Sequence, residues 1–110
     1  MNTLRGEFSF TLNKKKYQAC LSLNAMRLMC NAMGVKLNDM DKWLSDDPLT
    51  AIPAFAYYGV KNQAARKGKE SGLPDFEHFC ALALDDSETL DTMMQAVTEA
   101  LGAGEDTSGN

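Results

Sequence analysis

The chain has 110 residues, a net charge of −4 and a hydrophobic fraction of 45%, which indicate one globular domain with a modest core. No apolar run approaches the roughly 20 residues that span a bilayer, and the N-terminal MNTLRGEF lacks the apolar stretch of a signal peptide. We therefore expect a cytoplasmic protein with no membrane partner. Three cysteines without a CxxC pair and a single histidine, His78, predict buried free thiols, no metal site and no cofactor.

Charge is divided unevenly along the chain. Residues 1–69 hold all 11 basic residues and five acidic ones, a net +6, whereas residues 70–110 hold ten acidic residues and no basic one, a net −10. The two halves either neutralise each other within one fold or form two faces of opposite sign. Such faces would suit head-to-tail self-association, and therefore a homo-oligomer, or a partner with a basic surface. The acidic half disfavours nucleic-acid binding.

The first predicted element is a β-hairpin over residues 5–22. Alternation in EFSFTL and again after residue 16 gives it one apolar face, formed by Phe8, Phe10, Leu12, Tyr17, Ala19 and Leu21, with Cys20 on the other side. The turn is predicted at residues 13–16, because Asn13 tolerates left-handed geometry. A two-stranded hairpin is marginal alone, so its apolar face must pack on helices. Its outer edge is either protected or pairs with another chain.

After residue 22 the hydrophobic spacing becomes helical. The first helix is expected to end at Gly34 and to turn inward a stripe comprising Leu23, Met26, Cys30 and Met33. Met29 lies partly outside this stripe, beside Leu28, and is a candidate to face a partner. Asn38 is expected to cap a second, short helix over DMDKWLS.

The third helix is expected to begin near Thr50, because Pro53 is tolerated only within a first helical turn. Its stripe comprises Ile52, Phe55, Ala56, Gly59 and Gln63. Gly59 indicates either the close approach of another helix or a mild weak point in this one.

A fourth helix over DFEHFCALAL turns Phe76, Phe79, Cys80 and Ala83 inward. The fifth begins with Asp85 and Glu88 at capping-box spacing and ends at Gly102, with an apolar side of Leu90, Met93, Met94, Val97 and Leu101. The predicted class is therefore mainly α (α+β), an N-terminal β-hairpin followed by about five helices in a small bundle. Residues 1–102 form the single domain, and residues 103–110 are predicted to be disordered.

No catalytic constellation is visible, so we expect a protein that is not an enzyme. The glycines of GVKNQAARKGKESG do not form a phosphate-binding loop, and the sequence HFC places His78 and Cys80 on different faces of a helix. The paired aspartates, such as Asp85 and Asp86, lie where helix N-termini favour negative charge.

Three regions are candidates for partner contacts. The lysine turn, Lys14, Lys15 and Lys16, is either a solvated loop tip or a basic contact point. Tyr57 and Tyr58 lie off the main stripe of the third helix, where they suit either an interface or half-buried packing. The end of that helix carries Lys61, Arg66, Lys67 and Lys69, which either complement the helix dipole or, as a third possibility, bind DNA. Our candidate partner-binding residues are Lys14, Lys15, Lys16, Tyr57, Tyr58, Lys61 and Arg66.

The order of elements resembles a known family. The chain opens with a strand ending F-x-L-N, a lysine-bearing turn and LSLNAMR, continues through MGVKL, WLSDDP and IPAFAYYGV, and closes with LDDSETLDTMMQAVTEALG. Over roughly residues 5–102 this pattern resembles the tail assembly chaperones of long-tailed bacteriophages and prophages. Two features depart from it: Asn13-Lys14 stands where such hairpins often carry Asn-Gly, and the connection around residues 68–72 is long.

The resemblance implies a non-catalytic protein that binds the long helical tape measure protein, keeps it soluble and helps the tail tube protein to polymerise around it. It also implies a longer product made by ribosomal frameshifting, action in the bacterial host cytoplasm and absence from the mature virion. The alternative is a small cytoplasmic helical adaptor or regulatory subunit that binds one protein partner at a fixed, low stoichiometry.

Overall fold

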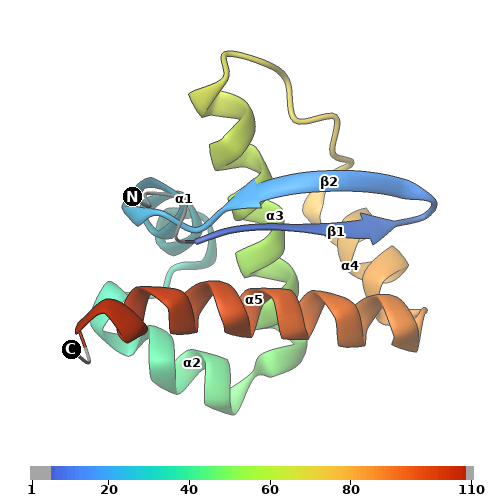
Figure 1. Ribbon diagram of the computed structural model, residues 1–110. Helices are drawn as coiled ribbons and strands as arrows, with labels where there is room; N and C mark the ends of the chain where they lie inside the picture. The colour runs from blue at the N-terminus through green and yellow to red at the C-terminus, as the bar shows by residue number, and fades with distance from the viewer. Residues whose placement is uncertain (1–5, 109–110) are drawn as a thin grey trace.

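The computed structural model describes the backbone of residues 6–108 and the side chains of residues 6–101. An antiparallel hairpin of β1 (Glu7–Leu12) and β2 (Lys15–Cys20) comes first. It is followed by α1 (Leu23–Met33), the short 3₁₀ helix η1 (Leu37–Asp39), α2 (Met40–Asp46), α3 (Pro48–Arg66), α4 (Phe76–Leu84) and α5 (Ser87–Ser108) (Figure 1). The predicted class, a hairpin followed by five helices, is confirmed. The predicted hairpin residue 5 and the tail residues 109–110 lie outside the described range.

Helix α3 is the centre of the fold. From Ala51 to Val60 every residue is buried except Tyr58, which is half-buried. The hairpin, α1, α2, α4 and α5 all pack against this helix, and Figure 1 shows it crossing behind the hairpin and α5. The stripe predicted for the helix is therefore buried, together with most of its other faces.

The start of α3 differs from the prediction. The helix begins at Pro48, whose fixed φ and missing N–H suit a first helical position, and not near Thr50. Pro53 consequently lies inside the helix and removes one backbone hydrogen bond. Burial on nearly every side holds the helix together despite this loss, because tertiary packing outweighs local propensity.

The hairpin turn is shorter than predicted. Leu12 pairs with Lys15, so only Asn13 and Lys14 form the turn, and Lys15 and Lys16 belong to β2. Asn13 has φ of 53° and Lys14 has φ of 68°. Positive φ at both central residues is the pattern of a type I′ turn, which matches the twist of the two strands. Lys14 adopts this conformation without the glycine that usually favours it.

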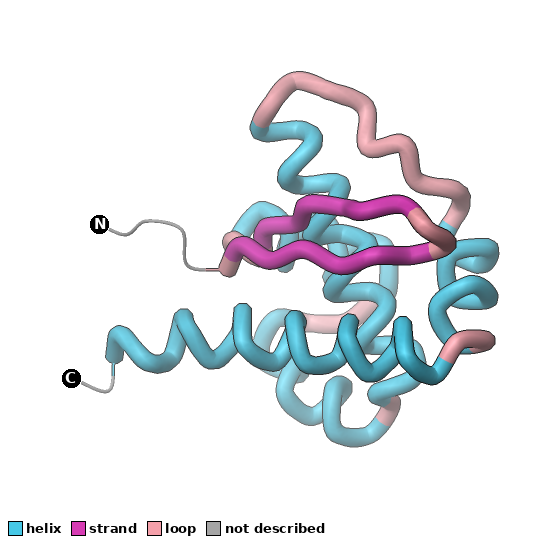
Figure 2. Tube along the Cα trace, turned by 45° about the vertical axis from the view of Figure 1, so that its right-hand side comes forward, coloured by secondary structure: helices cyan, strands magenta, loops and turns pink. Residues whose placement is uncertain are grey.

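The hairpin packs its apolar face on the helices, as predicted. Phe10, Leu12, Tyr17 and Ala19 are buried, and both views show the hairpin lying along α5 while it crosses α3 (Figures 1 and 2). Gly59 marks a close approach, but the neighbour is a strand and not a helix. A Cβ added at Gly59 would lie 3.2 Å from the Ala19 Cβ. The absence of a side chain on α3 thus lets β2 approach the helix backbone.

Several predicted helix ends were wrong. Asn38 does not cap α2, because it lies within η1. Asp86, and not Asp85, caps α5: its carboxylate accepts hydrogen bonds from the Glu88 N–H at 3.2 Å and the Thr89 hydroxyl at 2.7 Å. Backbone hydrogen bonding continues α5 past Gly102 to Ser108, through most of the segment predicted to be disordered. None of the helices within residues 6–108 combines the length and apolarity that crossing a bilayer requires.

Candidate partner-binding site

The side of helix α1 that faces the core overlaps the predicted stripe only in part. Its buried residues are Ala25 and Met29, and Met29, the predicted partner-facing residue, is only 1% exposed. Leu23, from the stripe expected to point inward, is 78% exposed. Met26 and Cys30 are half-buried. Met26, Cys30 and Met33 of the predicted stripe pack against the core, so the prediction is wrong for Leu23 and for Met29.

A buried polar cluster accounts for the exposure of Leu23 at the start of α1. Asn62 of α3 is completely buried; its amide nitrogen donates to the Cys20 carbonyl at 3.0 Å and to the Ser22 hydroxyl at 2.8 Å. Its amide oxygen accepts a hydrogen bond from the Asn24 side chain at 2.9 Å. Asn24 is thereby turned toward α3. Successive helical residues are about 100° apart, so Leu23 lies on roughly the opposite side of α1 from the buried Ala25.

The exposed side of α1 forms one wall of a groove. The chain turns back at Gly34, whose φ of 70° suits glycine, and the segment after it forms the second wall. The groove has a volume of about 460 Å³ and is lined by Leu23, Met26, Arg27, Cys30, Asn31, Val35, Lys36 and Leu37. We call it the α1 groove. Leu23 and Leu37, at 78% and 57%, are the most exposed large hydrophobic side chains in the described part of the chain.

The charged residues that line the α1 groove are both basic. Arg27 donates from Nε and Nη2 to the Asn24 amide oxygen, at 3.0 and 2.8 Å, which fixes the guanidinium and leaves Nη1 outside these bonds. Neither Arg27 nor Lys36 has a carboxylate oxygen within 4.0 Å among the described residues. The groove thus combines exposed apolar surface with two cations, although Lys36 also lines a neighbouring pocket with Asp39 and Asp46.

Tyr57 is buried, more deeply than either alternative predicted for it, an interface or half-buried packing. It is 5% exposed, its hydroxyl donates to the Pro74 carbonyl at 2.7 Å, and its ring packs edge-on against Phe76 and Phe79. Burial raises the pKa of Tyr57 above its usual 10.0, and the nearby Tyr58 makes a smaller contribution in the same direction. Tyr58 is half-buried beside it. Tyr57 therefore anchors the segment before α4 to α3.

The basic residues predicted at the end of α3 are partly engaged within the fold. The Lys61 ammonium lies 5.2 Å from the centre of the Tyr57 ring, a cation–π distance. Arg66 Nη1 donates to the Cys20 sulfur at 2.9 Å and lies 3.6 Å from a Glu7 carboxylate oxygen. Arg66 thus links the end of α3 to the base of the hairpin. It also helps to cover Cys20, which is buried despite its predicted place on the outer face of the hairpin.

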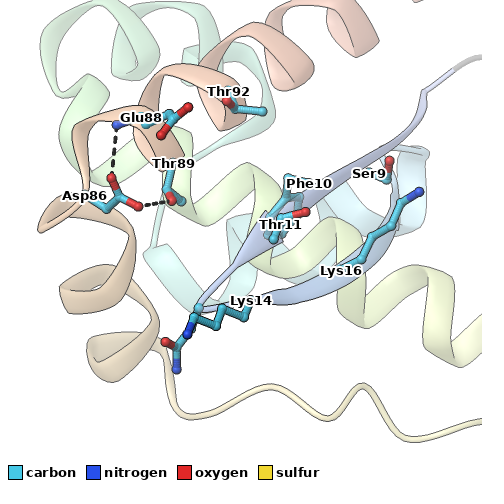
Figure 3. Close-up of a pocket in the computed structure, with 10 residues that line it drawn as sticks. Ser9, Phe10, Thr11, Lys14, Lys16, Asp86, Glu88, Thr89 and Thr92 are labelled. Carbon is cyan, nitrogen blue, oxygen red and sulfur yellow. Dashed lines mark hydrogen bonds between the residues drawn. The ribbon is translucent and has the colours of Figure 1, made fainter.

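The lysine turn does not form one basic cluster. Lys15 Nζ lies 5.2 Å from the Tyr17 ring, whereas Lys14 and Lys16 line a second pocket between the hairpin and the start of α5 (Figure 3). This pocket, of about 610 Å³, also contains Asp86 and Glu88, so opposite charges meet in it. Capping of the helix, led by the Thr89 hydroxyl, lowers the pKa of Asp86.

None of the candidate residues predicted from sequence lines the α1 groove. The prediction of buried free thiols holds for Cys20, while Cys30 and Cys80 are half-buried and also free. Burial raises the pKa of the Cys80 thiol above its usual value, which disfavours the reactive thiolate.

Comparison with known proteins assigns no family to the chain. No protein-family model, curated protein or solved structure matches it. The function proposed below therefore rests on the sequence pattern and on the geometry of the described residues.

Proposed function

We propose that this protein is a non-catalytic tail assembly chaperone of a long-tailed phage or prophage, which binds the helical tape measure protein and promotes assembly of the tail tube around it. The observation that carries the proposal is the α1 groove. It leaves Leu23 and Leu37 on the surface, where a partner gains free energy by covering them. The family resemblance supplies the identity of that partner.

The size of the groove favours a partner bound by many copies. Complete burial of an exposed leucine side chain gains about 1.5–3 kcal/mol, so two leucines provide only a modest gross energy. Part of that energy is lost in ordering the two molecules. A single groove would therefore bind weakly. A long helical partner that presents repeated sites to associated copies gains strength by multivalency, which suits a protein that coats a tape measure and then has to leave it.

The placement of charge is compatible with copies arranged in a row. The C-terminal end of α3 lies at the top of both views, whereas α2 and α5 lie toward the bottom (Figures 1 and 2). Lys67 and Lys69 follow α3 in the chain, whereas residues 37–47 and 87–101 are mostly acidic where they are charged, with Asp39, Asp41, Asp46, Asp47, Glu88, Asp91 and Glu99 against Lys42. Ends of opposite sign attract in a salt-dependent manner and favour head-to-tail contacts. Within one copy, Lys14 and Lys16 line a pocket together with Asp86 and Glu88, so part of the opposite charge also meets inside the fold.

In this proposal the protein acts in the host cytoplasm, has the tape measure and tail tube proteins as partners, and is absent from the mature virion. It binds neither nucleic acid nor membrane. The alternative function, a small helical adaptor with one partner, is favoured by the presence of a defined apolar groove. The two functions differ in stoichiometry, because an adaptor forms a fixed complex of low order.

The first test is the gene's surroundings. We expect a slippery heptamer near the codons for residues 100–104, an overlapping reading frame and a very long helical reading frame downstream. The product of that frame, co-expressed with this protein, should purify as a complex with many copies of the chaperone per partner, measured by light scattering. Metabolic or regulatory neighbours, or a strictly monomeric protein at low salt with and without the partner, would contradict the proposal.

A further inference from the structure

We infer that the α1 groove binds one amphipathic helix of a protein partner, with the apolar stripe of that helix against Leu23 and Leu37 and its acidic residues beside Arg27 and Lys36. The inference rests on the proposed function, since it names the kind of segment that the groove recognises.

The shape of the groove favours a helix as its occupant. Leu23, Met26 and Cys30 stand at positions i, i+3 and i+7 of α1, the spacing that forms a ridge along a helix. Val35 and Leu37 form the facing wall. A second helix laid between two apolar walls buries its own i, i+3, i+4 and i+7 positions. Met26 adds an adaptable side chain, which suits partner segments that differ in sequence.

The length of the groove sets the length of the recognised segment. At 1.5 Å per residue, the ridge from Leu23 to Cys30 extends about 10 Å, or two helical turns. A partner segment of two to three turns therefore covers it. A recognition segment of this length can occur many times along one long helical chain.

Charge determines which amphipathic helix fits best. The chain has 15 acidic and 11 basic residues, yet the charged residues of the groove lining are Arg27 and Lys36. Arg27 is already oriented by Asn24, so its free Nη1 meets a carboxylate at little entropic cost. A partner helix with glutamate or aspartate on its flanks gains from both cations, whereas one with basic flanks is repelled.

A second copy of this chain is a poorer occupant. Its α5 is acidic, but the apolar side of that helix already packs in its own core through Met93, Val97 and Ala100. Among the side chains that the structure describes, the exposed large hydrophobic residues of this region are Met94 on α5 and Leu84 on α4, which are ten positions apart and do not form a stripe of two turns. A helix from another protein is therefore a better occupant than α5 of a second copy.

The test uses three synthetic helical peptides with fluorescent labels. Two share one leucine stripe and differ only in their flanks, which are glutamate in one and lysine in the other. The third has glutamate flanks and glutamine in place of leucine. Binding to the full-length protein is measured by anisotropy at low and at physiological salt. We expect the glutamate-flanked leucine peptide to bind best, about tenfold more tightly than the lysine-flanked one at low salt.

Variants of the groove assign the binding to it. Leu23→Ser should weaken binding of the glutamate-flanked leucine peptide about tenfold, because the bound peptide then no longer covers a leucine side chain at this position. The double substitution Arg27→Glu and Lys36→Glu should reverse the preference between flanks. The matched control, Lys67→Glu with Lys69→Glu, makes the same change of charge outside the groove and should preserve the preference. Circular dichroism establishes that each variant is folded.

Four outcomes would overturn the inference: no binding of either leucine peptide, equal binding of both flanks, equal loss in the control variant, or self-association of the free protein that the groove variants abolish. The last result would place a second copy in the groove. Failure of the proposed function is separate from these. If the tape measure product binds normally to the Leu23→Ser and charge-reversed variants, the groove inference fails and the function stands. If the gene has no tape measure neighbour but the peptides bind as expected, the function fails and the groove inference stands.

Discussion

Removal of the Asn62 side chain should destabilise the protein strongly, because this buried amide joins three parts of the fold. Asn62→Ala deletes the hydrogen bonds to the Cys20 carbonyl, the Ser22 hydroxyl and the Asn24 amide. Ser22 is half-buried and Asn24 is exposed, so both find water in the variant. Cys20 is 3% exposed, and its carbonyl is left without a partner.

The expected loss follows from these separate costs. An intramolecular hydrogen bond contributes about 1 kcal/mol net, and a buried polar group left unpaired costs about 1–3 kcal/mol. The smaller side chain also leaves a cavity. Because Ser22 and Asn24 recover bonds to water, we expect a total of about 3 kcal/mol for Asn62→Ala. A loss of that size is a large part of the 5–15 kcal/mol that typically stabilises a domain of this kind.

Urea unfolding, followed by far-ultraviolet circular dichroism and by the fluorescence of the single tryptophan, Trp43, measures this loss. Asn24→Ala removes one partner at the exposed side and should cost no more than about 1 kcal/mol. Asn31→Ala is the control, because Asn31 is exposed and has no side-chain hydrogen bond among the described residues; its change should stay within about 0.5 kcal/mol. If Asn62→Ala were as stable as the Asn31→Ala control, the cluster would not hold α1 in its orientation.

Three further perturbations test other parts of the fold. Lys14→Gly should stabilise the protein by about 1 kcal/mol in thermal unfolding, because glycine accepts the positive φ of the turn without strain, whereas Lys14→Ala should give no such gain. Tyr57→Phe should lose about 1 kcal/mol with the hydrogen bond to Pro74. Because the pKa of Tyr57 is raised, the protonated hydroxyl contributes its full stability below pH 10.0, and this contribution is lost as the pH rises through the folded-state pKa. On going to alkaline pH, the wild type should therefore lose more stability than the Tyr57→Phe variant. The lowered pKa of Asp86 has the opposite sign: the stability difference between wild type and Asp86→Ala should be present at neutral pH and shrink as the pH falls below 3.8 and through the folded-state value.

The hairpin and the core of α4 were predictable from the sequence, because their patterns are strong and local. Phe10 and Leu12 repeat with period two, and both are buried. Phe79, predicted to point inward from α4, is completely buried as well. The stripe of α3 was also predicted, but a stripe cannot reveal that a helix is covered on its remaining faces. Tyr57 lies on one of these other covered faces of α3, where Phe76 and Phe79 of α4 pack against its ring, and the prediction for it therefore failed.

The candidate site was not predictable in the same way. Periodicity in α1 identifies an apolar stripe but does not identify what covers it. The orientation of α1 depends on Asn24 meeting Asn62, which lies 38 positions away in the sequence. No local pattern encodes that contact. Asn62 itself stands between Lys61 and Gln63 near the end of α3, so its sequence neighbours do not mark it as buried.

The structure also explains why a mostly helical protein has an N-terminal hairpin with no further strand beside it among residues 6–108. A helix that is buried on nearly every face needs cover on each of them, and 110 residues provide few long helices for the task. A flat, two-stranded element covers the face of α3 where Gly59 lets Ala19 approach, and α5 supports its other side. The apolar face of the hairpin is therefore used within the fold. The two most exposed large hydrophobic side chains of the described residues, Leu23 and Leu37, lie together in the groove, so the groove, and not the hairpin or its lysines, is where a partner has the most to gain.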